Sequence, residues 1–126
     1  MPWNLTSDRP IFMQIIEIIQ LAIVSGKYAP GDKLPSVRDL ASEAAVNPNT
    51  MQKALAELER GGLVYSKRTS GRFITEDVQM IAALKSSLAR DKIEAFLESM
   101  QNLGFQKEDT IALMQEMQNE REKENL

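Results

Sequence analysis

The sequence contains no cysteine and no histidine. The absence of cysteine excludes disulfide bonds and thiolate chemistry, and it suits a reducing compartment. The absence of histidine removes both the most common general base and the most common metal ligand. The chain also offers no glycine-rich phosphate loop, no nucleophile beside a base and no paired metal ligands. These absences predict a protein that is not an enzyme, with no catalytic residue, no metal and no cofactor.

The chain also lacks a long apolar run. Its most apolar stretch, residues 11–24, is too short for a membrane span and is interrupted by Gln14, Glu17 and Gln20. The first ten residues, MPWNLTSDRP, lack the basic and apolar regions of a signal peptide. We therefore expect a cytoplasmic protein without membrane contact. Its 126 residues suffice for one domain with a buried core, or for a compact domain with an appendage.

Charge is distributed unevenly along the chain. Residues 1–75 hold nine Lys or Arg and seven Asp or Glu, a net charge of +2, whereas residues 76–126 hold six and eleven, a net charge of −5. The overall charge of −3 is therefore the sum of two unlike parts. The positive front part suits an anionic partner, and the negative rear part does not.

Apolar residues at helical spacing predict a first helix over residues 10–25, with Gln14, Glu17 and Gln20 as a narrow polar stripe. Gly26 ends this helix, and the following GKYAPGDKLPS is expected to be a structured loop.

Two shorter helices follow. Ser36 with Asp39 resembles a capping box for a helix over residues 37–44, which would expose Arg38. Asn47 is a favoured N-cap and Pro48 suits a first helical position, so a second helix is predicted over residues 48–60. Gly61-Gly62 supplies a left-handed residue that ends it.

A β-hairpin is predicted next, with strands at residues 63–66 and 72–75 and the tip KRTSG. Lys67, Arg68 and Arg72 have no acidic neighbour in this stretch, so the tip carries a local charge of +3. Two short helices joined by a tight turn and followed by a basic hairpin are typical of a winged helix-turn-helix, whose second helix enters the major groove of DNA.

Two further helices are predicted over residues 76–101 and 107–118, both with apolar stripes, while the last eight residues are expected to fray. The predicted fold is therefore mainly α with a small β-hairpin. Residues 1–75 would form an N-terminal winged helix-turn-helix, and residues 76–126 a C-terminal two-helix dimerisation segment. The alternative is that the rear helices fold back on the first helix of the same chain.

Four stretches resemble the GntR family of bacterial transcription regulators, and the short rear part resembles its YtrA-like branch. They are PIFMQI (10–15), GKYAPGDKLPSVRDLA (26–41), VNPNTMQKAL (46–55) and ELERGGLVYSKRTSGRFI (57–74), about half of the chain. The resemblance implies a homodimeric repressor that binds a palindromic operator in double-stranded DNA and controls a transporter operon. Whether a small-molecule effector binds, and whether regulation is negative or positive, is left open.

The residues expected to contact DNA lie in the two short helices and the hairpin. They are Ser36, Arg38, Asn47, Asn49, Thr50, Gln52, Lys53, Lys67, Arg68, Gly71 and Arg72. Gln suits adenine and Lys suits guanine, so Gln52 and Lys53 are the candidates for base contacts. Two departures from the family bear on this set. Many members carry arginine in place of Pro48 and Gln52, and the tip Thr69-Ser70-Gly71 replaces a glycine, any residue, glycine pattern.

Each assignment has a structural alternative. Ser36 and Asn47 could act as helix caps alone, and Thr50, Gln52 and Lys53 could lie on an ordinary exposed helix face. Arg38 could pair with Asp39 or Glu43, and the basic hairpin could be a solvated edge. The competing function is a winged helix that docks another protein without binding DNA.

Overall fold

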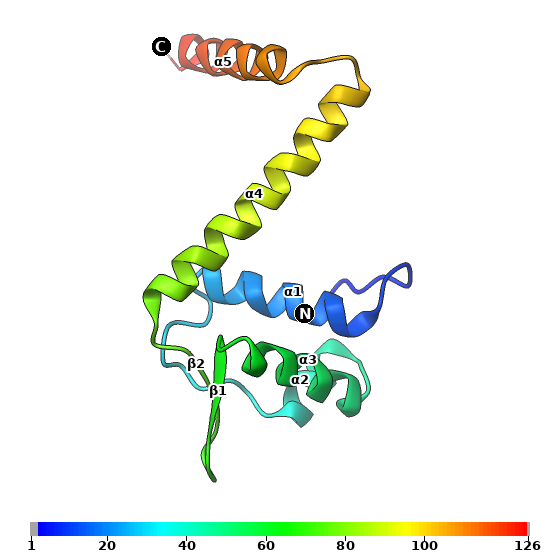
Figure 1. Ribbon diagram of the computed structural model, residues 1–126, viewed down its shortest axis with the longest axis vertical. Coiled ribbons are helices and arrows are strands. Elements are labelled where there is room, and N and C mark those ends of the chain that lie inside the picture. The colour runs from blue at the N-terminus through cyan, green and yellow to red at the C-terminus, as the bar shows by residue number, and fades with distance from the viewer. Residues whose placement is uncertain (1–2, 126) are drawn as a thin grey trace. The chain divides into compact units, whose positions relative to one another are not determined.

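The computed structural model describes residues 3–125, which form three helices, a two-stranded hairpin and two further helices (Figure 1). The elements are α1 (Ile11–Val24), α2 (Val37–Ala44), α3 (Pro48–Arg60), β1 (Val64–Lys67), β2 (Gly71–Ile74), α4 (Val78–Asn102) and α5 (Lys107–Glu124). The prediction of a mainly α fold with one small hairpin is confirmed. Among the residues described, no helix combines the length and apolar character needed to cross a membrane.

The chain forms two compact units that divide between Lys85 and Ser86. In the first unit, α3 packs against both α1 and α2 and contacts β1. The apolar spacing of α1 and α3 explains this arrangement, because it places Ile15, Ile19, Met51 and Leu55 in one core with exposures of 1% or less. Each such buried side chain contributes about 1.5–3 kcal/mol from the hydrophobic effect. The start of α4 also belongs here, since Met80, Ile81 and Leu84 pack against the core.

The ends of α2 and α3 are where the sequence predicted them. The Ser36 hydroxyl accepts a hydrogen bond from the Asp39 N–H at 3.1 Å, and Asn47 Oδ1 accepts one from the Asn49 N–H at 2.7 Å. Gly62, with φ +86°, is the left-handed residue that follows α3. The helix-turn-helix therefore has its termini set by local capping chemistry.

In the hairpin, the predicted strand pairing is kept, but each strand lies one residue closer to the tip than its predicted bounds, at Val64–Lys67 and Gly71–Ile74. The ladder pairs Val64 with Ile74 and extends to Lys67 opposite Gly71, so the unpaired tip contains only residues 68–70. The Tyr65 and Phe73 rings stack across the ladder with centroids 5.8 Å apart. Figure 1 shows this wing projecting away from α2 and α3.

The prediction that Gln14 belongs to a polar stripe on α1 is wrong. Its side chain is buried, donating to the carbonyls of Thr6 and Arg9 at 2.8 and 2.9 Å and accepting from the Thr6 N–H at 2.8 Å. Gln14 therefore ties the N-terminal arm, residues 3–9, to α1. Burial is tolerated because the amide is fully engaged in hydrogen bonds.

The second unit contains the remainder of α4 and all of α5. The Asp109 carboxylate accepts from the Gln106 N–H at 2.9 Å, so the acidic first turn caps α5 as its sequence suggests. Helix α5 continues to Glu124, beyond the predicted end at residue 118, and the expectation that the tail frays is wrong for residues up to 124. Several large apolar side chains of this unit are exposed, namely Ile93, Phe96, Leu103, Ile111, Met114 and Met117.

Candidate nucleic-acid interface

The N-terminus of α3 is an exposed helix end made of small polar residues. Asn47 and Asn49 are exposed, and Thr50 is half-buried beside the apolar anchor Met51. The Asn49 N–H donates to the Asn47 side chain, and the Thr50 and Met51 N–H groups donate to the Asn47 carbonyl. The positive end of the helix dipole at such a terminus favours an anion such as a phosphate. Capping by Asn47 is confirmed, whereas contact of Asn47, Asn49 and Thr50 with DNA stays a prediction.

Gln52 and Lys53 lie one turn further and point to different neighbours. Gln52 is exposed and lines a shallow hollow with Glu59, Arg60 and Arg72. The Lys53 ammonium instead lies 4.0 Å from the centre of the Phe12 ring of α1, a cation–π contact. Gln52 is therefore placed toward the wing, and Lys53 toward α1.

At the start of α2, the side chains of Ser36 and Arg38 differ in their contacts. The Ser36 hydroxyl oxygen accepts the capping hydrogen bond from the Asp39 N–H, and contact of Ser36 with DNA stays a prediction. Arg38 is exposed and forms no ion pair within the described part of the chain, so the predicted alternative of a pair with Asp39 or Glu43 is not seen there. Its guanidinium is available for a phosphate or a base edge.

The cations of the wing differ in their surroundings. Lys67 and Arg68 are exposed, although the Lys67 ammonium lies 4.7 Å from the centre of the Phe73 ring. Arg72 has an acidic neighbour after all, since its Nε lies 3.3 Å from Oε1 of Glu59. The expectation of an uncompensated charge of +3 on the hairpin is wrong, because the fold brings α3 to the base of the wing.

A broad concavity separates the wing from the start of α2. Its lining includes Lys33, Ser36, Lys67 and Arg72. The sequence analysis placed Lys33 in a loop and did not predict that it belongs to the interface. The structure pairs it with Phe73 in an isolated antiparallel bridge, and the flanking Leu34 N–H donates to the Arg72 carbonyl at 2.9 Å. A single bridged residue has no sequence period, so only the three-dimensional structure could place this lysine beside the wing.

The local structure explains why residue 71 is a glycine, independently of any ligand. Its φ of +110° is unfavourable for residues with a side chain, and a Cβ built there would lie 3.1 Å from Cε of Lys33. The glycine therefore permits the close approach of the Lys33 side chain to the wing. Contact of Gly71 itself with DNA stays a prediction.

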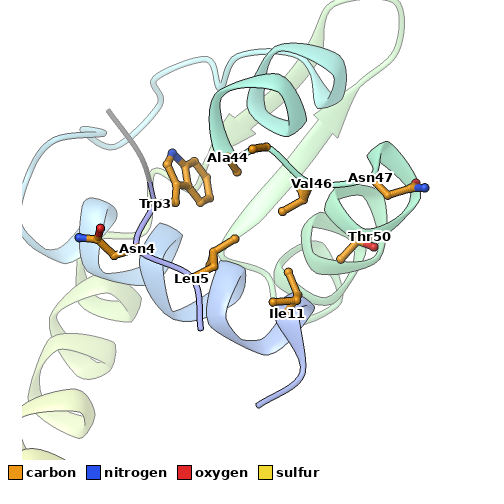
Figure 2. A pocket seen from close by; sticks show the side chains of 9 residues that line it. Trp3, Asn4, Leu5, Ile11, Ala44, Val46, Asn47 and Thr50 are labelled. Atoms are coloured by element: carbon orange, nitrogen blue, oxygen red, sulfur yellow. The ribbon is translucent and has the colours of Figure 1, made fainter. Parts of the chain in front are cut away.

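The N-terminal arm forms one wall of a further pocket, close to the turn between α2 and α3. Figure 2 shows Trp3, Leu5, Ile11 and Val46 gathered around it, with Asn47 and Thr50 on the neighbouring first turn of α3. Trp3 is only 7% exposed. The arm therefore braces the turn that sets the position of α3, a role that the sequence analysis did not detect.

Comparison with known proteins assigns this arrangement to a family. The pattern of bacterial regulatory proteins of the gntR family matches residues 13–74, which hold α2, α3, both strands and most of α1. The HTH-type transcriptional regulator YhcF of Bacillus subtilis is 42% identical over 105 residues, 83% of this chain and 87% of that protein. The chain belongs to the gntR family of bacterial regulatory proteins. The resemblance seen in the sequence is thereby confirmed.

Other relatives support the assignment of this chain to the gntR family. The HTH-type transcriptional repressor YtrA of Bacillus subtilis is 39% identical over 97 residues, 77% of this chain and 70% of that protein. The solved GntR family transcriptional regulator from Listeria monocytogenes is 41% identical, with a TM-score of 0.82 over 89% of this chain and 98% of that chain. AraR(DBD) in complex with operator ORX1 is 32% identical, with a TM-score of 0.52 over 57% of this chain and 88% of that one.

The gntR-family relatives establish both fold and class of function. The first unit is a winged helix-turn-helix, in which α2 and α3 form the helix pair and β1–β2 the wing. The protein is a transcriptional regulator and not an enzyme.

Proposed function

We propose that this regulator binds a DNA operator through α3 and the wing, with α3 in the major groove and the wing along the backbone or over the minor groove. One observation carries the proposal. Arg72 lines both the hollow that holds Gln52 and the concavity that holds Ser36 and Lys67, so the helix pair and the wing present one continuous surface. Grooves and phosphates of one duplex match such a surface.

The residues divide by the kind of contact that their chemistry supports. Gln52 contacts a base edge, and its amide suits adenine. Asn49, Thr50, Arg38, Arg68 and the helix end capped by Asn47 contact phosphates, and Lys33, Lys67 and Arg72 add positive charge beside them. Lys53 contacts guanine only if it leaves the Phe12 ring.

Homodimerisation completes the proposed function. Five large apolar side chains on and after α4 and on α5 are exposed, and their burial against a second copy would be favourable: Ile93, Phe96, Leu103, Ile111 and Met114. Two copies related by a two-fold axis would bind an inverted repeat, with residues 1–75 as the DNA-binding part and residues 76–126 as the dimerisation part.

The biological role follows from the relatives. YtrA is a repressor, so we propose repression as the mode of action. We propose a transporter operon as the target because the short rear part resembles the YtrA-like branch, whose members often repress such operons. A protein that binds bacterial DNA acts in the cytoplasm.

Selection from a pool of random duplexes tests the proposal. The full chain should enrich an inverted repeat whose half-sites lie about one helical turn apart. Gln52→Ala should alter the enriched base at one position of each half-site. Failure to enrich any sequence above the starting pool would contradict DNA recognition and favour a protein-docking role for the winged helix.

A further inference from the structure

Glu59, in the last turn of α3, contacts both strands of the wing through one oxygen. Its Oε1 accepts from the Ser66 hydroxyl at 2.9 Å and from Arg72 Nε at 3.3 Å. Ser66 and Arg72 are directly opposite each other in the β1–β2 ladder. A single carboxylate therefore joins the proposed recognition helix to a cross-strand pair of the wing.

The contact through Nε leaves the outer part of the Arg72 guanidinium available. Neither Nη atom of Arg72 has a hydrogen-bond partner within residues 3–125. The guanidinium is planar, so a partner at Nε restricts the directions in which the Nη groups can point. The Arg72 side chain is only 21% exposed and borders both concave surfaces of the interface.

We infer that Glu59 is a positioning residue for DNA recognition: it fixes the wing against α3 and holds Arg72 in one orientation between them. The inference rests on the proposed DNA-binding function. If the inference holds, Glu59 affects how well the protein discriminates its operator from other DNA. A preoriented Arg72 contacts one defined location on the duplex, whereas a released Arg72 can reach any nearby phosphate.

A purely electrostatic role for Glu59 makes a different prediction. A carboxylate near DNA repels phosphates, so its removal alone would strengthen binding to all duplexes by a similar factor. A stabilising role is also insufficient, because the Glu59 side chain is 38% exposed and ion pairs at such sites contribute little. The ratio of affinities for specific and scrambled DNA separates positioning from both alternatives.

A double-mutant cycle on the full chain tests the inference. Glu59→Ala, Arg72→Ala and the double variant would be titrated, at one salt concentration, with the duplex selected by the wild type and with a scrambled duplex. Glu59→Ala should lower the specific-to-scrambled ratio about five-fold or more, and should raise affinity for scrambled DNA. In the Arg72→Ala background, Glu59→Ala should change the ratio by less than about two-fold, because Glu59 acts through Arg72.

Two further variants serve as controls. Glu57→Ala removes the same charge from α3 and frees Arg60, its partner at 3.0 Å, without touching the wing. It should leave the ratio unchanged. Glu59→Gln keeps an oxygen that can accept from Ser66 and Arg72, so it should retain most of the ratio. If thermal unfolding shows Glu59→Ala to be misfolded, Glu59→Leu, which also lacks an acceptor oxygen, replaces it and should lower the ratio in the same way.

The inference would be overturned if Glu57→Ala and Glu59→Ala lowered the specific-to-scrambled affinity ratio equally. It would also be overturned if the effects of Glu59→Ala and Arg72→Ala on this ratio were additive. A wild-type chain that binds both duplexes equally would instead contradict the proposed function itself. The two failures are therefore distinguishable in one set of titrations.

Discussion

Ala45 ends α2 in the left-handed conformation, with φ 59° and ψ 46°. This conformation costs a residue with a Cβ about 1–2 kcal/mol, and glycine is the usual residue at this position. The N–H of Ala45 still donates to the Ser42 carbonyl at 3.2 Å. The tight turn of the helix pair is therefore formed at an energetic cost that the packing of α2 and α3 offsets.

Ala45→Gly should stabilise the protein by about 0.5–1 kcal/mol, because relief of the left-handed strain exceeds the added flexibility of the unfolded chain. Chemical denaturation of the wild type and the variant would measure the difference. DNA affinity should stay unchanged, since residue 45 is not among the proposed contacts. A loss of stability would show that the turn is not strained.

Arg38 and Gln52 should differ in how their loss affects DNA binding. Arg38→Ala removes a proposed phosphate contact, so it should weaken binding to all duplexes and reduce the slope of log affinity against log salt by about 1. Gln52→Ala should cost about 1–3 kcal/mol of discrimination at one base pair and leave the salt slope nearly unchanged. Fluorescence anisotropy over a series of salt concentrations and single-base variants would measure both quantities. If neither substitution changed affinity in a folded protein, the proposed interface would be wrong.

Helix α3 shows which features of an element its sequence determines. Its first and last residues were predicted because Asn47, Pro48 and Gly62 act through local backbone chemistry. Its hydrophobic face was predicted because Met51, Leu55 and Leu58 recur at helical spacing. The wing strands were located, but their ends shifted by one residue because Lys67 pairs with Gly71 across a tip in which Thr69 adopts a φ of 66°.

Side-chain partners within the candidate site could not be predicted in the same way. Arg72 meets Glu59 across 13 residues of sequence, and Lys53 meets Phe12 from another helix. Lys33 joins the wing by one isolated bridge. These contacts depend on how elements pack, which neither periodicity nor capping patterns specify. The residue types at the site could therefore be predicted, but not the ion pair that orients one of them.

The N-terminus of α3 offers a test that separates capping from DNA contact. Aspartate caps a helix about as well as asparagine, so Asn47→Asp should leave stability within about 0.5 kcal/mol of the wild type. The added negative charge should nevertheless weaken DNA binding, because it faces the proposed phosphate. Thermal unfolding and anisotropy titration would measure the two effects. An unchanged affinity for DNA would mean that Asn47 is a cap alone and lies away from the duplex.

The whole chain divides its charge and its apolar surface in complementary ways. Residues 1–75 carry a net charge of +2, whereas residues 76–126 carry −5. Residues 76–126 therefore have little affinity for a polyanion, and their exposed apolar residues suit a protein partner. This division agrees with one part that binds DNA and another that binds a second copy.

Charged substitutions on the second unit should produce monomers. Phe96 and Met114 are 44% and 55% exposed, so Phe96→Glu with Met114→Glu should leave each chain folded but disrupt an apolar interface. Operator affinity should fall at least about ten-fold, because only one half-site is bound at a time. Light scattering and anisotropy would measure mass and affinity, and Gln118→Glu, at an exposed polar position of α5, is the matched control. A variant that stays dimeric would place the interface elsewhere.

The most direct test of the account is a titration of the full chain with the selected inverted-repeat duplex at about 50 mM and about 200 mM salt. We expect two chains per duplex and an affinity that falls by a factor of about 1,000 or more between the two conditions, because several phosphates are contacted by each copy. Saturation by a single chain, or an affinity that does not fall as salt rises, would contradict the account.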